Sequence, residues 1–301
     1  MQTKHKIRNI ILLFLTAMIW GLAFVAQSVS MDYIGAMTFI FLRSLIGGMV
    51  LVPFILLLDW KEHKSDTGLL SLWKDPLLLR GGIVCGIFLF LGNAFQQNGI
   101  KYTTVGKAGF ITTFYIIIIP IIGIFFKKFC GPLTWIAVVI ALAGLYFLCI
   151  NEALQFQFGD LLILICAFMF SGQVLAIDHY NQWVNSVKLS CIQFLVCGVI
   201  AFVLMLATEK PDFTMIRAAA IPILYTGIMS TGVAYTLQTV GQKGMNPTVA
   251  ALILSMESVF SALAGFFILH QVLSVRELLG CGLMFIAIIL AQLPDRKKAA
   301  A

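Results

Sequence analysis

Long runs of apolar residues with almost no charge dominate the chain and restrict what it can fold into. About 20 apolar residues suffice for a helix to cross the hydrocarbon core of a bilayer. Only helices and closed barrels satisfy every backbone group there, and the apolarity is continuous rather than alternating, which excludes a barrel. The sequence therefore predicts an all-α membrane protein with ten transmembrane helices, over residues 9–28, 36–58, 78–99, 107–126, 132–150, 159–179, 188–208, 217–240, 247–269 and 275–293.

The composition excludes a water-soluble protein. The 301 residues are 60% hydrophobic and 11% charged, whereas soluble domains are about 25% charged. The net charge of +7 is spread between the apolar runs and is not clustered with aromatic residues, so no nucleic-acid partner is expected. The lipid bilayer is the expected surrounding, and a small molecule the expected substrate.

The basic residues orient the helices. With the N-terminus inside, 14 of the 20 Lys and Arg residues fall on the cytoplasmic side and five on the other. This asymmetry predicts that both termini of the multi-pass protein are cytoplasmic. The seven cysteines form no Cys-x-x-Cys pair, so no metal or other cofactor is predicted.

The chain also resembles itself at two offsets. A shift of 142 residues pairs Gly123 with Gly265, and a shift of 150 residues gives the pairs Leu45 with Leu195, Gly48 with Gly198 and Asp59 with Glu209. Both shifts place each helix on the fifth helix after it, as two tandem copies require. We therefore expect two repeats of five helices each, residues 1–150 and 151–301.

An odd number of helices per copy inverts the second copy in the membrane. Inverted repeats place a substrate site near the midplane, at their interface, and let one half rock against the other. This arrangement favours a secondary transporter that works by alternating access.

Two ionisable residues lie deep inside predicted helices, where charges are costly and usually functional. We interpret Glu257 as a proton-coupling or cation-binding carboxylate; the alternative is a structural Glu that is protonated or paired. For Arg43 we favour an extended side chain that reaches the outer surface or pairs with Asp32, with substrate binding as the alternative.

Polar stripes occur on two helices that the repeat makes equivalent. Asn93 and Gln97 share one face of the third predicted helix, and Thr231, Tyr235 and Gln238 share a face of the eighth. Such a face either binds a ligand or joins two helices. Because such a polar stripe occurs in both halves of the chain, we predict a cavity that the two halves share.

Further candidates come from other helices. Trp20 can stack on a ligand, although a membrane Trp also serves as a packing residue or an interfacial anchor. The remaining candidate substrate-binding residues are Thr112, Tyr115 and Gln173. Pro120 is the expected kink in the fourth helix.

Several segments together resemble a known family. They are the Trp20-Gly21 pair, GKAGFITTFYIIIIP at 106–120 and NPTVAALILSMESVF at 246–260. These segments and the ten-helix pattern resemble EamA-type transporters of the drug/metabolite transporter superfamily, over nearly the whole chain. The resemblance implies an inner-membrane exporter of small metabolites without a cofactor. Its cavity would be lined by the first, third, fourth, sixth, eighth and ninth helices.

The predicted function is therefore secondary transport. We expect efflux of a small metabolite such as an amino acid, with proton exchange at Glu257 as the coupling hypothesis. The alternative is a lipid scramblase or a channel-like facilitator. We do not expect an enzyme, because no Ser or Cys pairs recognisably with a base. The expected oligomeric state is a monomer or a weak homodimer.

Overall fold

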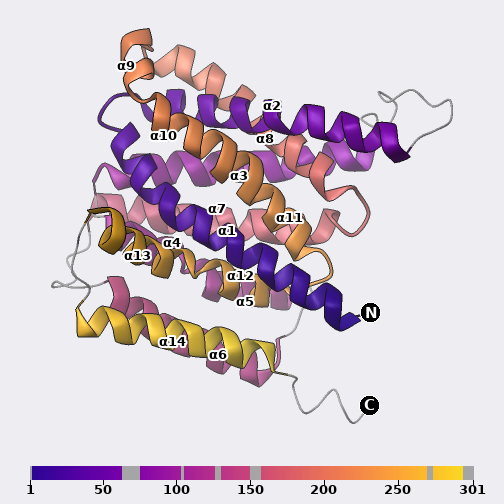
Figure 1. Cartoon of the computed structure of the whole chain (residues 1–301), viewed down its shortest axis with the longest axis vertical. Helices are drawn as coiled ribbons and strands as arrows, with labels where there is room; N and C mark the ends of the chain where they lie inside the picture. The colour runs from indigo at the N-terminus through magenta and orange to yellow at the C-terminus, as the bar shows by residue number, and fades with distance from the viewer. Residues whose placement is uncertain are drawn as a thin grey trace.

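The computed structural model describes residues 2–62, 75–102, 105–125, 130–149, 157–269 and 274–293, and these residues are all-helical apart from turns and short loops (Figure 1). In chain order the elements are α1 (Gln2–Ser30), α2 (Ala36–Glu62), α3 (Pro76–Ile100), α4 (Val105–Thr112), α5 (Tyr115–Phe125), α6 (Pro132–Cys149), α7 (Phe158–Tyr180), α8 (Ser186–Thr208), α9 (Phe213–Ala218), α10 (Ala220–Leu224), the π-helix η2 (Tyr225–Tyr235), α11 (Thr236–Gln242), α12 (Pro247–Leu254), α13 (Glu257–Leu269) and α14 (Val275–Gln292).

Most of these helices are long and apolar enough to cross a membrane. Eight segments qualify by length and composition: His5–Ser30, Ala36–Leu57, Pro76–Ile100, Ala108–Phe125, Phe158–Tyr180, Ser186–Thr208, Ala220–Gln242 and Pro247–Ala264. Two shorter apolar helices, Pro132–Phe147 and Leu278–Ala291, accompany them. The chain is thus a multi-pass membrane protein. The predicted boundary between the repeats, at residue 150, lies outside the described residues.

Several helices begin at residues suited to that position. Asp75 accepts a hydrogen bond from Leu77 N at the start of α3, and Asn246 accepts one from Thr248 N at the start of α12. In both cases a proline follows, whose missing N–H needs no partner at a helix start. The side chain of Asn185 caps α8 in the same way.

Two of the spans are interrupted at corresponding places. One consists of α4 and α5, which are separated by Thr113 and Phe114. The other consists of α12 and α13, which are separated by Ser255 and Met256, 142 residues further along the chain. Pro120, where a kink is expected from the sequence, lies inside α5 and not at the interruption.

A hydroxyl side chain accounts for each interruption. Thr113 Oγ1 donates to Phe110 O at 2.8 Å, and Ser255 Oγ donates to Leu252 O at 2.8 Å. Such bonds compete with the helical ladder. In both spans the N–H of the following residue bonds to the carbonyl three residues back, as in a 3₁₀ turn. Both interruptions therefore arise from the same local chemistry.

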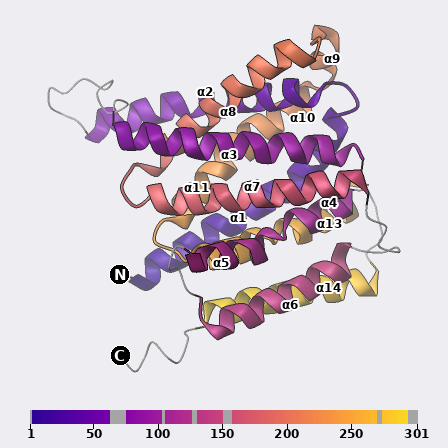
Figure 2. The ribbon, with the colours of Figure 1, turned by 180° about the vertical axis from the view of Figure 1, so that it is seen from behind.

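All of these elements except the short helix α9 pack as two bundles and one helix pair. We call the group α3, α4, α5, α7 and α8 the first bundle, because α7 packs on α3, α4 and α5 and α3 packs on α8. The second bundle comprises α1, α2, α10, η2, α11, α12 and α13, in which α1 packs on α10, η2, α11, α12 and α13, and α2 packs on η2 and α10. Helices α6 and α14 pack together at one edge, as Figures 1 and 2 both show.

Helices α2 and α8 join the two bundles along their length. A Cβ atom added at Gly48 would lie 3.1 Å from the Leu195 side chain, and one at Gly198 would lie 3.4 Å from Ser44 Cβ. Residues that the 150-residue offset equates, Gly48 and Gly198, thus occupy corresponding positions on the two facing helices. This contact relation is the one that a two-fold pseudo-symmetry axis between the helices produces.

Candidate functional site

A small cavity lies between the two bundles. It offers about 40 Å³ to the centres of water-sized spheres, and one water molecule needs about 10–15 Å³ on that measure. Its lining residues come from both bundles: Trp20, Phe24, Gln27, Arg43, Gln96, Thr112, Tyr115, Phe170, Gln173, Val174, Ser230, Tyr235, Gln238, Leu254 and Glu257. The cavity therefore has room for a few water molecules in this conformation.

Arg43 brings a positive charge to this cavity. Its side chain is 2% exposed, and its guanidinium donates to Thr231 Oγ1 at 2.9 Å and to Ser230 Oγ at 3.1 Å. The expectation that Arg43 reaches the surface or pairs with Asp32 is wrong, because the neighbouring π-helix supplies buried acceptors. Both acceptors are neutral hydroxyls, so these hydrogen bonds do not compensate the charge. A buried guanidinium of this kind suits an anionic ligand.

Glu257 brings an acidic group to the same cavity. Its side chain is 5% exposed, and Tyr115 OH donates to Glu257 Oε1 at 3.2 Å. Each of the two residues is the first of the helix that follows an interruption, α5 for Tyr115 and α13 for Glu257. The interrupted spans therefore meet at this hydrogen bond, and it joins the first bundle to the second.

Amide side chains form a second connection between the bundles. Gln238 Nε2 donates to Gln173 Oε1 at 3.5 Å, and Gln173 Nε2 donates to Gln193 Oε1 at 3.2 Å. Across the cavity, Gln96 Nε2 lies 3.4 Å from Thr112 Oγ1. The buried atoms Gln238 Oε1 and Gln27 Oε1 have no protein partner. Unpaired polar atoms beside a cavity are the groups that water or a ligand would satisfy.

An aromatic wall completes the lining. The rings of Trp20 and Tyr235 lie 4.6 Å apart, and Trp20 Nε1 donates to Ser230 O at 3.3 Å. Phe24 and Phe170 add two further rings. Because the indole N–H is already bonded, Trp20 presents mainly an apolar face to the cavity.

The structure brings together most of the residues predicted for the site. Trp20, Thr112, Tyr115, Gln173, Tyr235, Gln238 and Glu257 all line the cavity. The other three do not line it. Thr231 accepts a hydrogen bond from Arg43, and Gln97 contacts Met31 Sδ at 3.8 Å. Asn93 is buried elsewhere on α3.

The sequence reasoning missed Gln96 and Ser230. Gln96 belongs to the same polar run as Asn93 and Gln97, and only the rotation of α3 decides which amide faces the cavity. Ser230 lies in η2, whose wider turns change which residues share a face. Among the described residues, no group of three or more His, Cys, Asp or Glu side chains could hold a metal ion.

Comparisons with known proteins agree with this architecture. The model of the EamA-like transporter family matches residues 7–150 and 157–293. An uncharacterized transporter from Archaeoglobus fulgidus is 30% identical over 282 residues, which cover 93% of this chain and 84% of that protein. The uncharacterized transporter YwfM from Bacillus subtilis is 26% identical over 306 residues, which cover 97% of each chain.

A crystal structure with 17% sequence identity superposes with a TM-score of 0.79 and covers 97% of this chain and 99% of its own. That likeness concerns the fold alone. The two family matches together span nearly all of the sequence. This chain therefore belongs to the EamA-like transporter family.

Proposed function

We propose that this transporter is a secondary carrier that exports a small zwitterionic metabolite, such as an amino acid, by alternating access. The observation that carries the proposal is the pair of opposite ionisable groups, Arg43 and Glu257, in one buried cavity between the bundles. Ionisable groups inside membrane proteins usually serve transport or ligand binding.

The chemistry of the lining indicates the substrate class. A guanidinium held by Ser230 and Thr231 recognises a carboxylate, and the carboxylate of Glu257 recognises an ammonium group. The rings of Trp20 and Phe170 offer an apolar wall, or a surface for a cation, beside them. An α-amino acid with an apolar side chain carries all three matching groups.

The size of the cavity supports alternating access. Its volume is about 40 Å³, counted over the positions that the centre of a water molecule can occupy. This volume admits a few water molecules but no amino acid. Substrate binding therefore requires the bundles to separate at one end. The interrupted spans, α4–α5 and α12–α13, supply places where helices can bend.

Proton exchange at Glu257 is the proposed coupling step. Tyr115 is the hydrogen-bond donor to this carboxylate, so a change in the charge of Glu257 alters the contact between the bundles. A carboxyl group that binds either a proton or the substrate ammonium group would link the two fluxes.

The proposed topology has ten spans and both termini in the cytoplasm of an inner-membrane protein. It counts α6 and α14 as spans and treats the two halves as inverted five-helix repeats. The equivalent interruptions, and the contacts of Gly48 with Leu195 and of Gly198 with Ser44, support the repeat. We call the end at which α1 begins the inner end, at the right of Figure 1, and the opposite end the outer end.

Counterflow in proteoliposomes tests the proposal. The panel comprises labelled amino acids, amines, sugars and nucleosides, with the methyl ester of each accepted amino acid to remove its negative charge. We expect counterflow of an amino acid, at least about tenfold slower with the ester or with Arg43→Gln. Glu257→Gln is expected to abolish the response to a pH gradient. Arg80→Gln and Asp32→Asn are the matched controls, because both residues are exposed.

Three outcomes would contradict parts of this proposal. Equal transport of the ester would remove the role of Arg43, and a pH response that survives in Glu257→Gln would remove proton coupling at that residue. Flux that rises linearly with concentration, without counterflow, would replace the carrier with a channel-like facilitator or a scramblase.

A further inference from the structure

At the inner end a line of buried polar side chains runs from the cavity towards the surface. Beyond Gln173 and Gln238, Ser190 Oγ donates to Thr239 Oγ1 at 2.9 Å. Asn181 Nδ2 then donates to Thr239 O at 2.5 Å, and Ser186 Oγ donates to Asn181 Oδ1 at 2.6 Å. All four residues of this line are buried. We call Asn181, Ser186, Ser190 and Thr239 the inner polar cluster.

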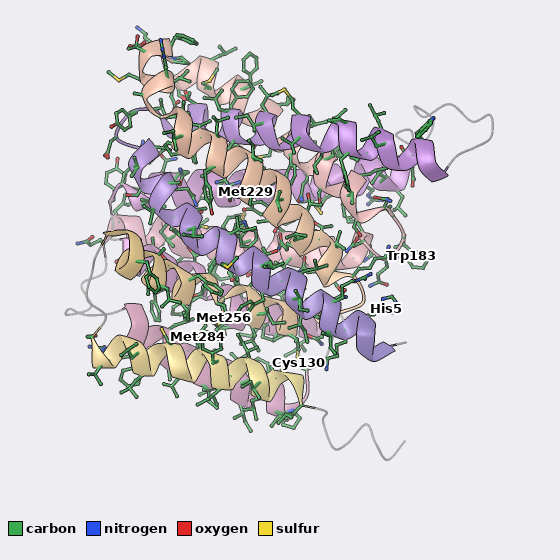
Figure 3. The ribbon with its side chains drawn as sticks, viewed as in Figure 1. His5, Cys130, Trp183, Met229, Met256 and Met284 are labelled. Carbon is green, nitrogen blue, oxygen red and sulfur yellow. The ribbon has the colours of Figure 1, made fainter. Side chains whose placement is uncertain are left out.

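The inner polar cluster joins the two bundles. Thr239 lies on α11 of the second bundle, whereas Ser186 and Ser190 lie on α8 of the first and Asn181 directly follows α7. Figure 3 shows Trp183, two residues beyond Asn181, at the same end of the molecule as His5 near the start of α1. The bundles therefore cannot separate at the inner end without breaking the hydrogen bonds of Ser190 and Asn181 to Thr239, whereas the bond from Ser186 to Asn181 lies within the first bundle.

The pseudo-symmetry identifies the equivalent residues at the outer end. The offset of 150 relates α1 and α2 to α7 and α8, and the offset of 142 relates the end of α3 to α11. Contacts confirm the second offset: Gly99 packs on Ile163, and Gly241 packs on Leu13. The four equivalents of the cluster are Met31, Ala36, Ile40 and Gln97.

These equivalents are mostly apolar. The contact between them is the one from Gln97 Nε2 to Met31 Sδ, 3.8 Å long, and thioether sulfur is a weak acceptor. Gln97 Oε1 is buried without a partner. Two short hydrogen bonds between the bundles at the inner end, both to Thr239, thus correspond to one weak contact at the outer end.

An acidic residue links α2 to α8 at each end of the molecule. These links therefore do not create the difference in polar contacts between the inner and the outer end. At the inner end Lys188 Nζ lies 2.8 Å from Asp59 Oδ2. At the outer end the Glu209 carboxylate accepts bonds from Met37 N and Thr38 N, at 2.8 Å each, and from Thr38 Oγ1 at 2.6 Å. Asp59 and Glu209 are equivalent, so each end has one acidic link between α2 and α8.

We propose that the inner polar cluster is the inner gate of the transport cycle, and that it makes the outer end the easier one to open in the substrate-free protein. This proposal rests on alternating access in the proposed function. Both ends have an acidic link between α2 and α8. Apart from these links, opening the inner end breaks the two hydrogen bonds to Thr239, from Ser190 and from Asn181, whereas opening the outer end breaks the weak contact between Gln97 and Met31. The free transporter therefore favours states that are closed towards the cytoplasm, and inward opening needs substrate or proton binding to offset the lost bonds.

Accessibility of a reporter cysteine tests the gate. Val174→Cys places a thiol in the cavity wall of a variant whose native cysteines are replaced. A membrane-impermeant thiol reagent is applied to right-side-out and to inside-out vesicles, without substrate. We expect faster labelling from the outer side, and a shift of the labelling ratio towards the inner side on the order of tenfold in Asn181→Leu/Thr239→Val. Ser190→Ala makes a milder test if the double variant does not fold.

The reverse experiment builds the cluster at the outer end. Met31→Asn and Ile40→Ser place an amide and a hydroxyl beside Gln97 at the equivalent positions. This variant is expected to label more slowly from the outer side, while Ile40→Ala is its matched control. Gain of closure by added polar groups separates a gate from loss of stability, because a damaged fold would label faster from both sides.

The outcomes are distinguishable from failure of the proposed function. Labelling is measured without substrate, so a wrong substrate class leaves its result unchanged. A labelling ratio that stays constant in both sets of variants, with protein that is monodisperse and thermally stable, would overturn the gate. Loss of counterflow with the expected labelling shift would instead place the error in the substrate or its coupling.

Discussion

Arg43 is the residue whose placement most affects the chemistry of the cavity, and it predicts a trade between stability and transport. A buried charge without an anionic partner destabilises the folded state, by several kcal/mol in typical cases. Arg43→Gln removes the charge and keeps a donor for Thr231 or Ser230. We expect its thermal midpoint to equal or exceed that of the native protein, while counterflow falls at least about tenfold.

The matched substitution is Arg80→Gln on the exposed side of α3, which should leave both quantities unchanged. Thermal unfolding in detergent and counterflow in proteoliposomes are measured on the same preparations. A large loss of stability in Arg43→Gln would show that Arg43 acts as a structural link to η2.

At Gly21, α1 packs closely against α13. A Cβ atom there would lie 2.5 Å from Phe260 Cβ and 2.8 Å from Glu257 O, so α13 would have to move. Gly21→Ala is expected to destabilise the protein by about 1–3 kcal/mol, as overpacking usually does. It should also displace Glu257, which reduces counterflow more than the stability change alone would.

Gly282 on α14 gives the matched control, because no atom lies within 4 Å of a Cβ added there. Gly282→Ala should be neutral or slightly stabilising, since alanine is the better helix former. Thermal midpoints of the two variants decide the matter: similar midpoints would mean that α1 and α13 are not tightly packed at Gly21.

At the scale of elements, η2 accounts for a change in register between the two proposed repeats. Gly86 and Gly227 make equivalent contacts with Val196 and Ile46 at an offset of 141, whereas Gly99 and Gly241 do so at 142. The second half therefore contains one extra residue between these points, and the π-helix Tyr225–Tyr235 lies there. A π-helix accommodates one additional residue within a helix. It also carries Ser230 and Thr231 to Arg43.

Deletion of Met229 tests this role of η2. The shortened segment can become an ordinary α-helix without shifting the helices on either side, so the protein should still insert and remain monodisperse. The hydroxyl acceptors of Arg43 lose their alignment, and counterflow should be lost. Deletion of exposed Val199 from the continuous helix α8 is the control, and it should prevent stable folding. Equal damage by both deletions would contradict the one-residue insertion.

The long spans could be predicted from the sequence because an uninterrupted apolar run has few alternatives in a bilayer. The interruptions at Thr113 and Ser255 could not, since a hydroxyl bond to a carbonyl three residues back leaves no periodic signal. The obvious irregularity, Pro120, marks a different place in the same span. The π-helix could not be predicted either, because no residue type is diagnostic of one.

At the scale of the whole molecule, the offsets of the proposed repeat locate part of the cavity lining. Glu257 and Tyr115 occupy equivalent positions at the 142-residue offset, and they meet in the cavity. Arg43 and Gln193 are equivalent at the 150-residue offset, yet one binds η2 and the other binds Gln173. Periodicity locates such pairs, but the partner of each depends on helix rotations that only the packed structure fixes.

The two-fold relation between α2 and α8 makes a prediction about how the molecule moves. If the bundles rock about the middle of this helix pair, contacts at the middle persist while contacts at the ends break and form. Ser44 Cβ lies 3.4 Å from a Cβ built at Gly198, close to the roughly 3.5–4.5 Å of a disulfide. In a background without native cysteines, Ser44→Cys/Gly198→Cys should form a disulfide and still transport.

Cross-linking at the inner end should have the opposite effect. Asp59→Cys/Lys188→Cys replaces the ion pair between α2 and α8, and a reducible bifunctional thiol reagent joins the two positions. Counterflow should stop after cross-linking and return on reduction, because the inner end can no longer open. If the central disulfide also stops transport reversibly, the bundles must slide or separate along their whole length. Rocking about the middle of α2 and α8 would then be wrong.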